Sequence, residues 1–104
     1  MVSLVEFLRN CERATGTRLV TFDFEILFYL YLNGPSPSMT VLESTSASLA
    51  AFVKAIKRLT EQGLLVVEPG TEDRRVRNYD LAPDVREALR RAFEKHFGGE
   101  PPRS

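Results

Sequence analysis

The chain contains 104 residues, and its 14 basic and 14 acidic side chains give a formal net charge of zero. This length is enough for one domain with a modest core but leaves little for a separate ligand-binding domain. Hydrophobic residues make up 43% of the chain and charged residues 27%, as is ordinary for a globular protein. The longest nearly apolar stretch, residues 22–32, is too short to cross a membrane, so no membrane partner is expected.

The cysteine and histidine content argues against disulfides and metal sites. Cys11 and His96 are the single residues of their types, so one chain can complete neither an internal disulfide nor a zinc site. The apolar helix face around Cys11 is typical of an ordinary buried thiol; a redox-reactive thiol is the alternative. With no secretory signal at the start, these features predict a cytoplasmic protein without a cofactor. Neither an activated nucleophile nor a glycine-rich phosphate loop is indicated, so no enzyme is expected.

The first third of the chain predicts two helices. Leu4, Leu8 and Cys11 share a face at helical spacing and predict a short amphipathic helix. Thr21 suits the N-cap of a second helix, which is apolar on nearly every side and is therefore expected at the centre of the domain. The alternation over residues 20–26 also fits a strand, and the sequence leaves that alternative open.

Two further helices follow, joined by a short turn. Ser38 can cap a helix that runs to about residue 43 or 44, and residues 45–46 form a turn before a helix over about residues 47–62. The apolar stripe that this fourth helix should bury consists of Leu49, Phe52, Val53, Ile56 and Leu59. Its opposite face carries Ser48, Ala50, Ala51, Lys54, Lys57 and Arg58.

Residues 59–81 predict a helix end followed by a β-hairpin. Gly63 supplies the left-handed residue that commonly ends a helix, and residues 64–67 form an apolar, partly β-branched run suited to a strand. Residues 69–70 break that strand, and residues 71–73 make a polar tip. The segment that leads into the returning strand carries the basic residues Arg74, Arg75 and Arg77.

Pro83 suits the first position of a last helix, which Gly98 and Gly99 end. One face of this helix is apolar for almost four turns and is available to a second chain; it consists of Val85, Ala88, Leu89, Ala92, Phe93, His96 and Phe97. We therefore expect one domain over residues 1–97 and a flexible tail over residues 98–104. Two helices joined by a short turn and followed by a basic hairpin predict an α+β, mostly helical fold, a winged helix-turn-helix with a two- or three-stranded wing sheet.

The order of elements and the hairpin residues resemble the MarR family of bacterial transcription regulators. The matching positions are Leu59, Gly63, Leu64, Leu65, Asp73, Arg74, Arg75 and Leu81, with a looser likeness over residues 20–89. The resemblance implies that Asp73 braces the wing, that Arg75 enters the minor groove, and that the fourth helix enters the major groove. The expected DNA-contacting residues are Ser48, Ala50, Ala51, Lys54, Lys57, Arg58, Arg74, Arg75 and Arg77.

The family pattern is not complete in this chain. Leu42 and Ser46 stand where the family has a small residue and a glycine, and Ala82 replaces a threonine. Family members are generally longer, so the dimer interface formed by their first and last helices must be reduced or built differently here.

These features predict a DNA-binding transcriptional regulator that binds double-stranded DNA as a homodimer through its first and last helices. A small-molecule effector could bind at the dimer cleft.

Residues 46–79 carry a net charge of +2, residues 1–45 carry −2 and residues 80–104 carry none, so DNA affinity should be weak for one subunit and sensitive to salt. The alternative is a winged-helix protein-interaction module that has lost DNA binding, which a neutral chain with Ala50 and Ala51 on its recognition helix would suit.

Overall fold

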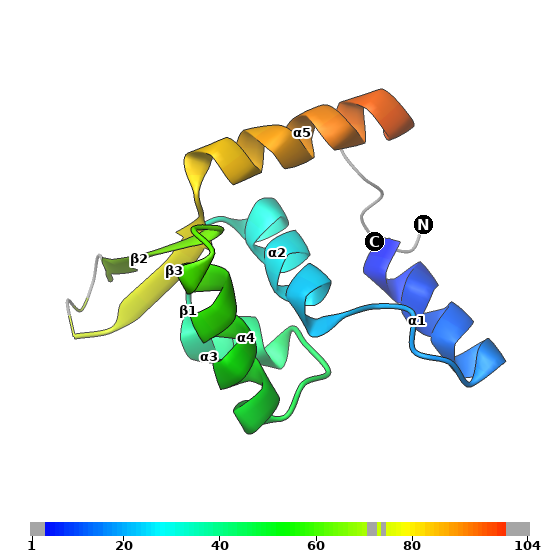
Figure 1. Cartoon of the computed structure of the whole chain (residues 1–104), viewed down its shortest axis with the longest axis horizontal. Helices are drawn as coiled ribbons and strands as arrows, with labels where there is room; N and C mark the ends of the chain where they lie inside the picture. Colours follow the sequence, from blue (N-terminus) through cyan, green and yellow to red (C-terminus); the bar gives the residue numbers. More distant parts are fainter. Residues whose placement is uncertain (1–3, 71–72, 74, 100–104) are drawn as a thin grey trace.

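A computed structural model of the chain describes residues 4–70, 73 and 75–99. Its elements, in chain order, are α1 (Leu4–Thr15), α2 (Phe22–Asn33), β1 (Ser36–Pro37), α3 (Ser38–Glu43), α4 (Leu49–Glu61), β2 (Leu65–Pro69), β3 (Arg77–Leu81) and α5 (Pro83–Phe97). Figure 1 shows α2 at the centre, α3 and α4 below it, and α5 along the opposite edge. The predicted α+β, mostly helical winged helix-turn-helix is confirmed. No helix in the described ranges is long and apolar enough to span a membrane.

The central helix α2 forms where its N-cap was predicted. The Thr21 hydroxyl accepts a hydrogen bond from the Phe24 N–H at 3.0 Å, which satisfies one of the free donors at the start of the helix. Ile26 and Leu30 are fully buried on this helix. The strand alternative for residues 20–26 is therefore wrong. The helix is apolar on all sides and is stable here because the surrounding elements cover it.

The wing sheet has three antiparallel strands in the order β1–β3–β2. The strand β1 is two residues long and has no sequence signal of its own. In β2, the strand continues to Pro69, which pairs with Arg77, so the expected break at residue 69 is wrong. A proline is tolerated there because β2 is an edge strand and needs no N–H from that residue for the ladder.

One hydrophobic cluster joins α2, α3, α4, the sheet and α5. Its largest fully buried side chains are Ile26, Leu30, Leu59, Leu81 and Val41. In α4 the buried residues are Phe52, Ala55, Ile56 and Leu59. The prediction that Leu49 and Val53 are also buried is wrong: they are 61% and 56% exposed. At 100° per residue, both lie to one side of the buried stripe, where α4 borders an open groove.

Two predicted helix starts also differ from the structure. The N-cap of α3 is Pro37, which makes no side-chain capping hydrogen bond, and the predicted cap Ser38 is the first helical residue. The helix α4 begins at Leu49, two residues later than expected. Its cap is Ser48, whose hydroxyl oxygen accepts a hydrogen bond from the Ala51 N–H at 3.2 Å.

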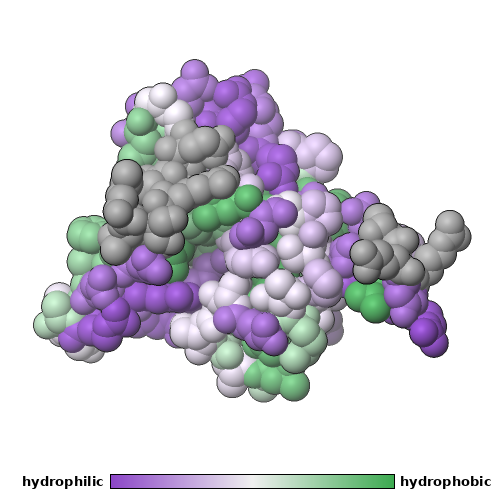
Figure 2. Space-filling view, turned by 180° about the vertical axis from the view of Figure 1, so that it is seen from behind, coloured by the Kyte–Doolittle hydropathy of each residue, from purple (hydrophilic) through white to green (hydrophobic). Residues whose placement is uncertain are grey.

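The terminal helices are much less buried than α2. No residue of α1 is buried, and Phe93 is the one buried residue of α5. Of the apolar stripe predicted on α5, Val85 and Leu89 are partly buried, whereas Ala88, Ala92, His96 and Phe97 are exposed. Viewed from behind, hydrophobic surface is visible between α5 and α1, below the hydrophilic outer side of α5 (Figure 2).

A buried charge connects α1 to the turn of the helix-turn-helix. The Glu25 side chain, only 1% exposed, pairs with Arg9 of α1 and accepts a hydrogen bond from the Ser46 hydroxyl at 3.0 Å. Arg9 also donates to the Ser44 carbonyl oxygen at 2.9 Å. The Glu25 carboxylate on α2 therefore holds both α1 and the turn between α3 and α4 in place.

Candidate nucleic-acid interface

The helix α4 presents three different surfaces. Its outermost residues, farthest from the buried stripe, are Ala50, Lys54, Lys57 and Glu61, all exposed. Toward α2, Ala51 is half-buried and Arg58 forms an ion pair with Asp23. Toward α3 and the wing, the exposed residues are Leu49 and Val53. The predicted contact residues on α4 therefore do not form one uniform face: two lysines point outward, and Arg58 is engaged by a carboxylate.

The α4 helix ends where the sequence predicts. Gly63 has a φ of 77°, and the Leu64 N–H donates to the Leu59 carbonyl oxygen at 3.0 Å. This left-handed ending is one that glycine adopts without the steric cost of a Cβ atom. It directs the chain from α4 straight into β2, so the wing stands beside α4 (Figure 1).

The tip of the wing is organised by Asp73. Its carboxylate accepts hydrogen bonds from the Arg75 backbone N–H at 3.0 Å and from Arg75 Nε and Nη2, each at 3.2 Å. The guanidinium hydrogen bonds, followed by the backbone N–H, hold the pKa of Asp73 below its usual value. The Arg75 side chain is nevertheless 91% exposed. A solvent-facing arginine is therefore held in place at the end of the hairpin.

Of the other two predicted wing residues, Arg77 begins β3 and is exposed, whereas Arg74 lies outside the described residues. Lys54 and Lys57 of α4 are also exposed, so the described residues present four basic side chains on α4 and the wing, besides Arg58, which pairs with Asp23.

Gly70 has a structural role beyond the strand break that its sequence position predicts. Its N–H donates to the Val76 carbonyl oxygen at 2.6 Å, which closes the loop of the wing. A Cβ atom at this position would lie 2.7 Å from the Asp73 carbonyl oxygen and 3.0 Å from that of Val76. Only glycine fits here, because a larger residue would place its Cβ atom against these two carbonyl oxygens. The position of Gly70 just after a strand and before a polar tip is the sequence feature that could have indicated this role.

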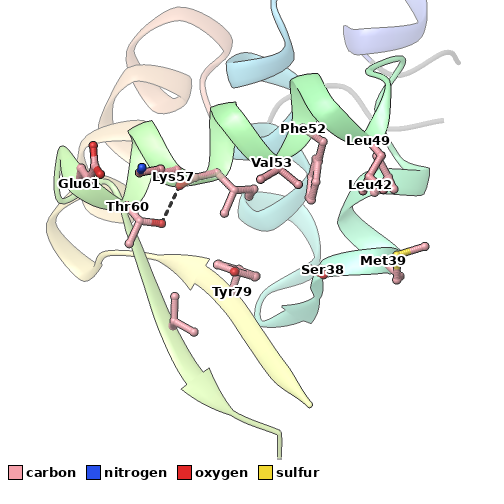
Figure 3. A pocket seen from close by; sticks show the side chains of 12 residues that line it. Ser38, Met39, Leu42, Leu49, Phe52, Val53, Lys57, Thr60, Glu61 and Tyr79 are labelled. Atoms are coloured by element: carbon pink, nitrogen blue, oxygen red, sulfur yellow. Dashed lines mark hydrogen bonds between the residues drawn. The ribbon is translucent and has the colours of Figure 1, made fainter. Parts of the chain in front are cut away.

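An apolar groove of about 370 Å³ separates α4 from the wing. Figure 3 shows Val53 and Leu49 on its α4 side, Met39 on α3 and Tyr79 on β3. Val67 of β2, which pairs with Tyr79, completes its sheet side. The sequence predicts burial of Leu49 and Val53, because they share the helical spacing of the buried residues. The sequence does contain a sign of this exposure. Ala55 is also apolar and faces the core, so the apolar residues of α4 cover a wider part of the helix than the core can bury.

Other chemistry has little support in the described part of the chain. Within it, no group of three or more His, Cys, Asp or Glu side chains could hold a metal ion. Cys11 is half-buried and is not in a disulfide.

No protein-family model and no curated protein sequence matches this chain. Solved structures do match. Lactococcus lactis ZitR, in an apo mutant form, has a TM-score of 0.64 at 26% identity, over 89% of this chain and 69% of that one. Bordetella bronchiseptica BpsR, whose DNA binding is regulated by 6-hydroxynicotinic acid, has a TM-score of 0.62 at 24% identity, over 95% and 82%. A probable transcriptional regulator from Pseudomonas aeruginosa has a TM-score of 0.61 at 22% identity, over 82% and 64%.

These similarities establish the fold. The structural neighbours are winged-helix transcriptional regulators and not enzymes. This chain spans less than two thirds of the length of the Pseudomonas protein.

Proposed function

We propose that this chain is a DNA-binding transcriptional regulator of the MarR type, with α4 in the major groove and the wing in the minor groove. The observation that carries the proposal is Arg75, 91% exposed at the wing tip and oriented by Asp73. An arginine gains from the negative potential of a narrow minor groove, and holding it in advance reduces the entropy lost on binding.

The residues of α4 contribute to different degrees in this proposal. Lys54 and Lys57 are exposed and are placed to neutralise phosphates. The Ser48 oxygen accepts the Ala51 N–H, which leaves the hydroxyl proton free to be donated to a phosphate oxygen. Arg58 contributes less, because its guanidinium is held by Asp23 of α2 and its side chain is only 49% exposed, against 91% for Arg75. Ala50 and Ala51 offer apolar contact to base edges.

The test is a mobility shift with duplex DNA at low salt. Arg75→Ala should raise the Kd by about tenfold and lower the slope of log Kd against log salt by about one. It should also weaken binding more than any single substitution at Ala50 or Ala51. The matched control is Arg91→Ala, which removes another exposed arginine, 75% exposed, from the distant helix α5. No shift by the wild-type protein, or an unchanged Kd for Arg75→Ala, would contradict the proposal.

The apolar groove beside α4 favours a second candidate function, a winged-helix protein-interaction module without DNA binding. The same experiment separates the two. Binding of duplex DNA that depends on Arg75 supports the regulator, and absence of any shift at low salt supports the interaction module.

We further propose that the chain forms a homodimer through α1 and α5. These helices expose Phe7 (55%) and Phe97 (49%), and α5 lies on the edge opposite α3 and α4 (Figure 1). A two-fold axis at that edge would present paired recognition helices to half-sites about one helical turn apart. A small-molecule effector in the dimer cleft stays a prediction.

Sedimentation at several concentrations tests the dimer. Phe97→Glu should shift the equilibrium toward monomer, because it places a charge in the apolar contact. Thr40→Glu, on the exposed surface of α3, is the control. A strict monomer at micromolar concentration would remove the paired half-site argument.

A further inference from the structure

The exposed apolar side chains of α4 are unusual for a helix that reads DNA by hydrogen bonds. Direct readout of base edges relies mainly on Arg, Lys, Asn and Gln. Along the side of α4 that faces the wing, the exposed hydrophobic residues Leu49 and Val53 stand instead, 61% and 56% exposed. They are four residues apart and therefore lie one above the other on the helix surface.

The surroundings of these two side chains favour a polyanion over an apolar protein segment. Lys57 lines the same groove, and Lys54 is exposed on the neighbouring outer surface of α4. The exposed Arg75 and Arg77 lie on the wing, on the far side of the groove. Glu61 lines the end of the groove near the C-terminus of α4, away from Leu49. An apolar strip with basic side chains on both sides is complementary to the major groove of DNA. There, the base edges would face the strip and the flanking phosphates would face the basic side chains.

The major groove offers one apolar group for such a strip to contact, the C5-methyl group of thymine. On the basis of the DNA-binding function proposed above, we propose that Leu49 and Val53 are specificity-determining residues that recognise thymine methyl groups. Their Cβ atoms are separated by about 5–6 Å, as expected for positions i and i+4 of a helix. Successive bases on one strand rise by about 3.4 Å, so the two side chains can contact thymines one or two base steps apart.

The expected strength of this recognition follows from the burial of one methyl group. Excluding it from water favours the complex by a factor of about four in Kd. Contact with two methyl groups therefore predicts a preference of roughly tenfold or more for duplexes that carry them over duplexes that lack them.

The test compares self-complementary duplexes of about two helical turns, one of alternating dA and dT and one of alternating dA and deoxyuridine. The two duplexes differ only in the C5-methyl group, so the phosphates and the minor groove read by the wing are kept. The wild-type protein should bind the thymine duplex about tenfold more tightly. A duplex of alternating dG and 5-methyl-dC should likewise bind more tightly than its unmethylated form.

Variants connect the preference to the two residues. Val53→Ala and Leu49→Ala should each reduce the ratio of the two Kd values, because each removes one of the side chains that contact the methyl groups. The matched control is Val66→Ala, which removes the same atoms from an exposed β2 residue whose neighbour in the strand, Val67, lines the groove. Circular dichroism checks that each variant is folded.

Each outcome decides the inference. Equal binding of the thymine and deoxyuridine duplexes would overturn methyl recognition while leaving DNA binding intact. A preference that survives both variants would assign the recognition to other residues and overturn the role of Leu49 and Val53. Failure to bind any of the duplexes at low salt would overturn the proposed function itself and favour a protein partner in the groove.

Discussion

Replacing Arg9 with methionine should lower the free energy of unfolding by about 3 kcal/mol, because it leaves a buried carboxylate without its counter-charge. The Glu25 side chain is 1% exposed, and that of Arg9 is 32% exposed. Breaking a buried ion pair from one side costs about 3–5 kcal/mol. We expect the lower end for two reasons. Glu25 keeps the Ser46 hydroxyl at 3.0 Å, and the substitution removes Arg9 Nε, which is buried without a hydrogen-bond partner in the described ranges.

Urea unfolding followed by circular dichroism measures the effect. Arg9→Met should also lower the melting temperature by about 12 °C or more, given about 4–8 °C per kcal/mol for a domain of this size. Glu25→Met should cost less, because the partly exposed Arg9 can turn its guanidinium toward water. The double variant should be more stable than Arg9→Met alone, since it leaves no buried charge unpaired.

The double-mutant cycle gives the decisive number. A coupling free energy above about 1 kcal/mol between Arg9 and Glu25 is expected for residues in direct contact in a buried network. If the losses from the two single variants simply add, the pair is not coupled and the reasoning fails. The same would follow if Arg9→Met were as stable as the wild type.

Two further predictions concern the wing and α5. Gly70→Ala should destabilise the fold by about 1–3 kcal/mol through overpacking, since the new Cβ would lie 2.7 Å from the Asp73 carbonyl oxygen. Hydrogen exchange should show faster exchange of the residue 70 amide, and unchanged exchange would contradict the role of this glycine. In α5, the guanidinium hydrogen bonds of Arg90 lower the pKa of Glu87 from 4.5 to about 2. The ionised carboxylate therefore stabilises the fold above pH 4.5, and this contribution is lost as the pH falls through about 2. An NMR titration of the Glu87 carboxyl group checks this, and Arg90→Gln should return its midpoint toward 4.5.

The helix boundaries were largely predictable because they depend on local chemistry. Thr21 caps α2, Pro83 begins α5, and Gly63 ends α4, as the sequence predicts. Each signal acts within one turn of the chain, through a side-chain hydrogen bond, a fixed φ or a left-handed residue. The predicted roles of the wing and α4 residues in DNA contact stay predictions, with Arg74 outside the described residues.

The features of α4 that the sequence did not predict have a common origin. Helical spacing predicts which residues share a side of α4, but not how wide a surface its neighbours cover. Leu49 and Val53 follow the spacing of the buried residues, yet α3 and the wing leave a groove over them. Arg58 was expected on the DNA-facing surface, and only the packing of α4 against α2 brings it to Asp23.

The sequence by itself determined the order of the helices, the hairpin and the basic character of the wing, because capping, turn formation and hydrophobic period are properties of neighbouring residues. The tertiary structure decided which charges are engaged and which apolar side chains face solvent. The pairing of Arg9 with Glu25 joins residues 16 positions apart, and the groove beside Val53 joins α3, α4 and the sheet. Such contacts depend on how whole elements pack against one another, which no local pattern in the chain records.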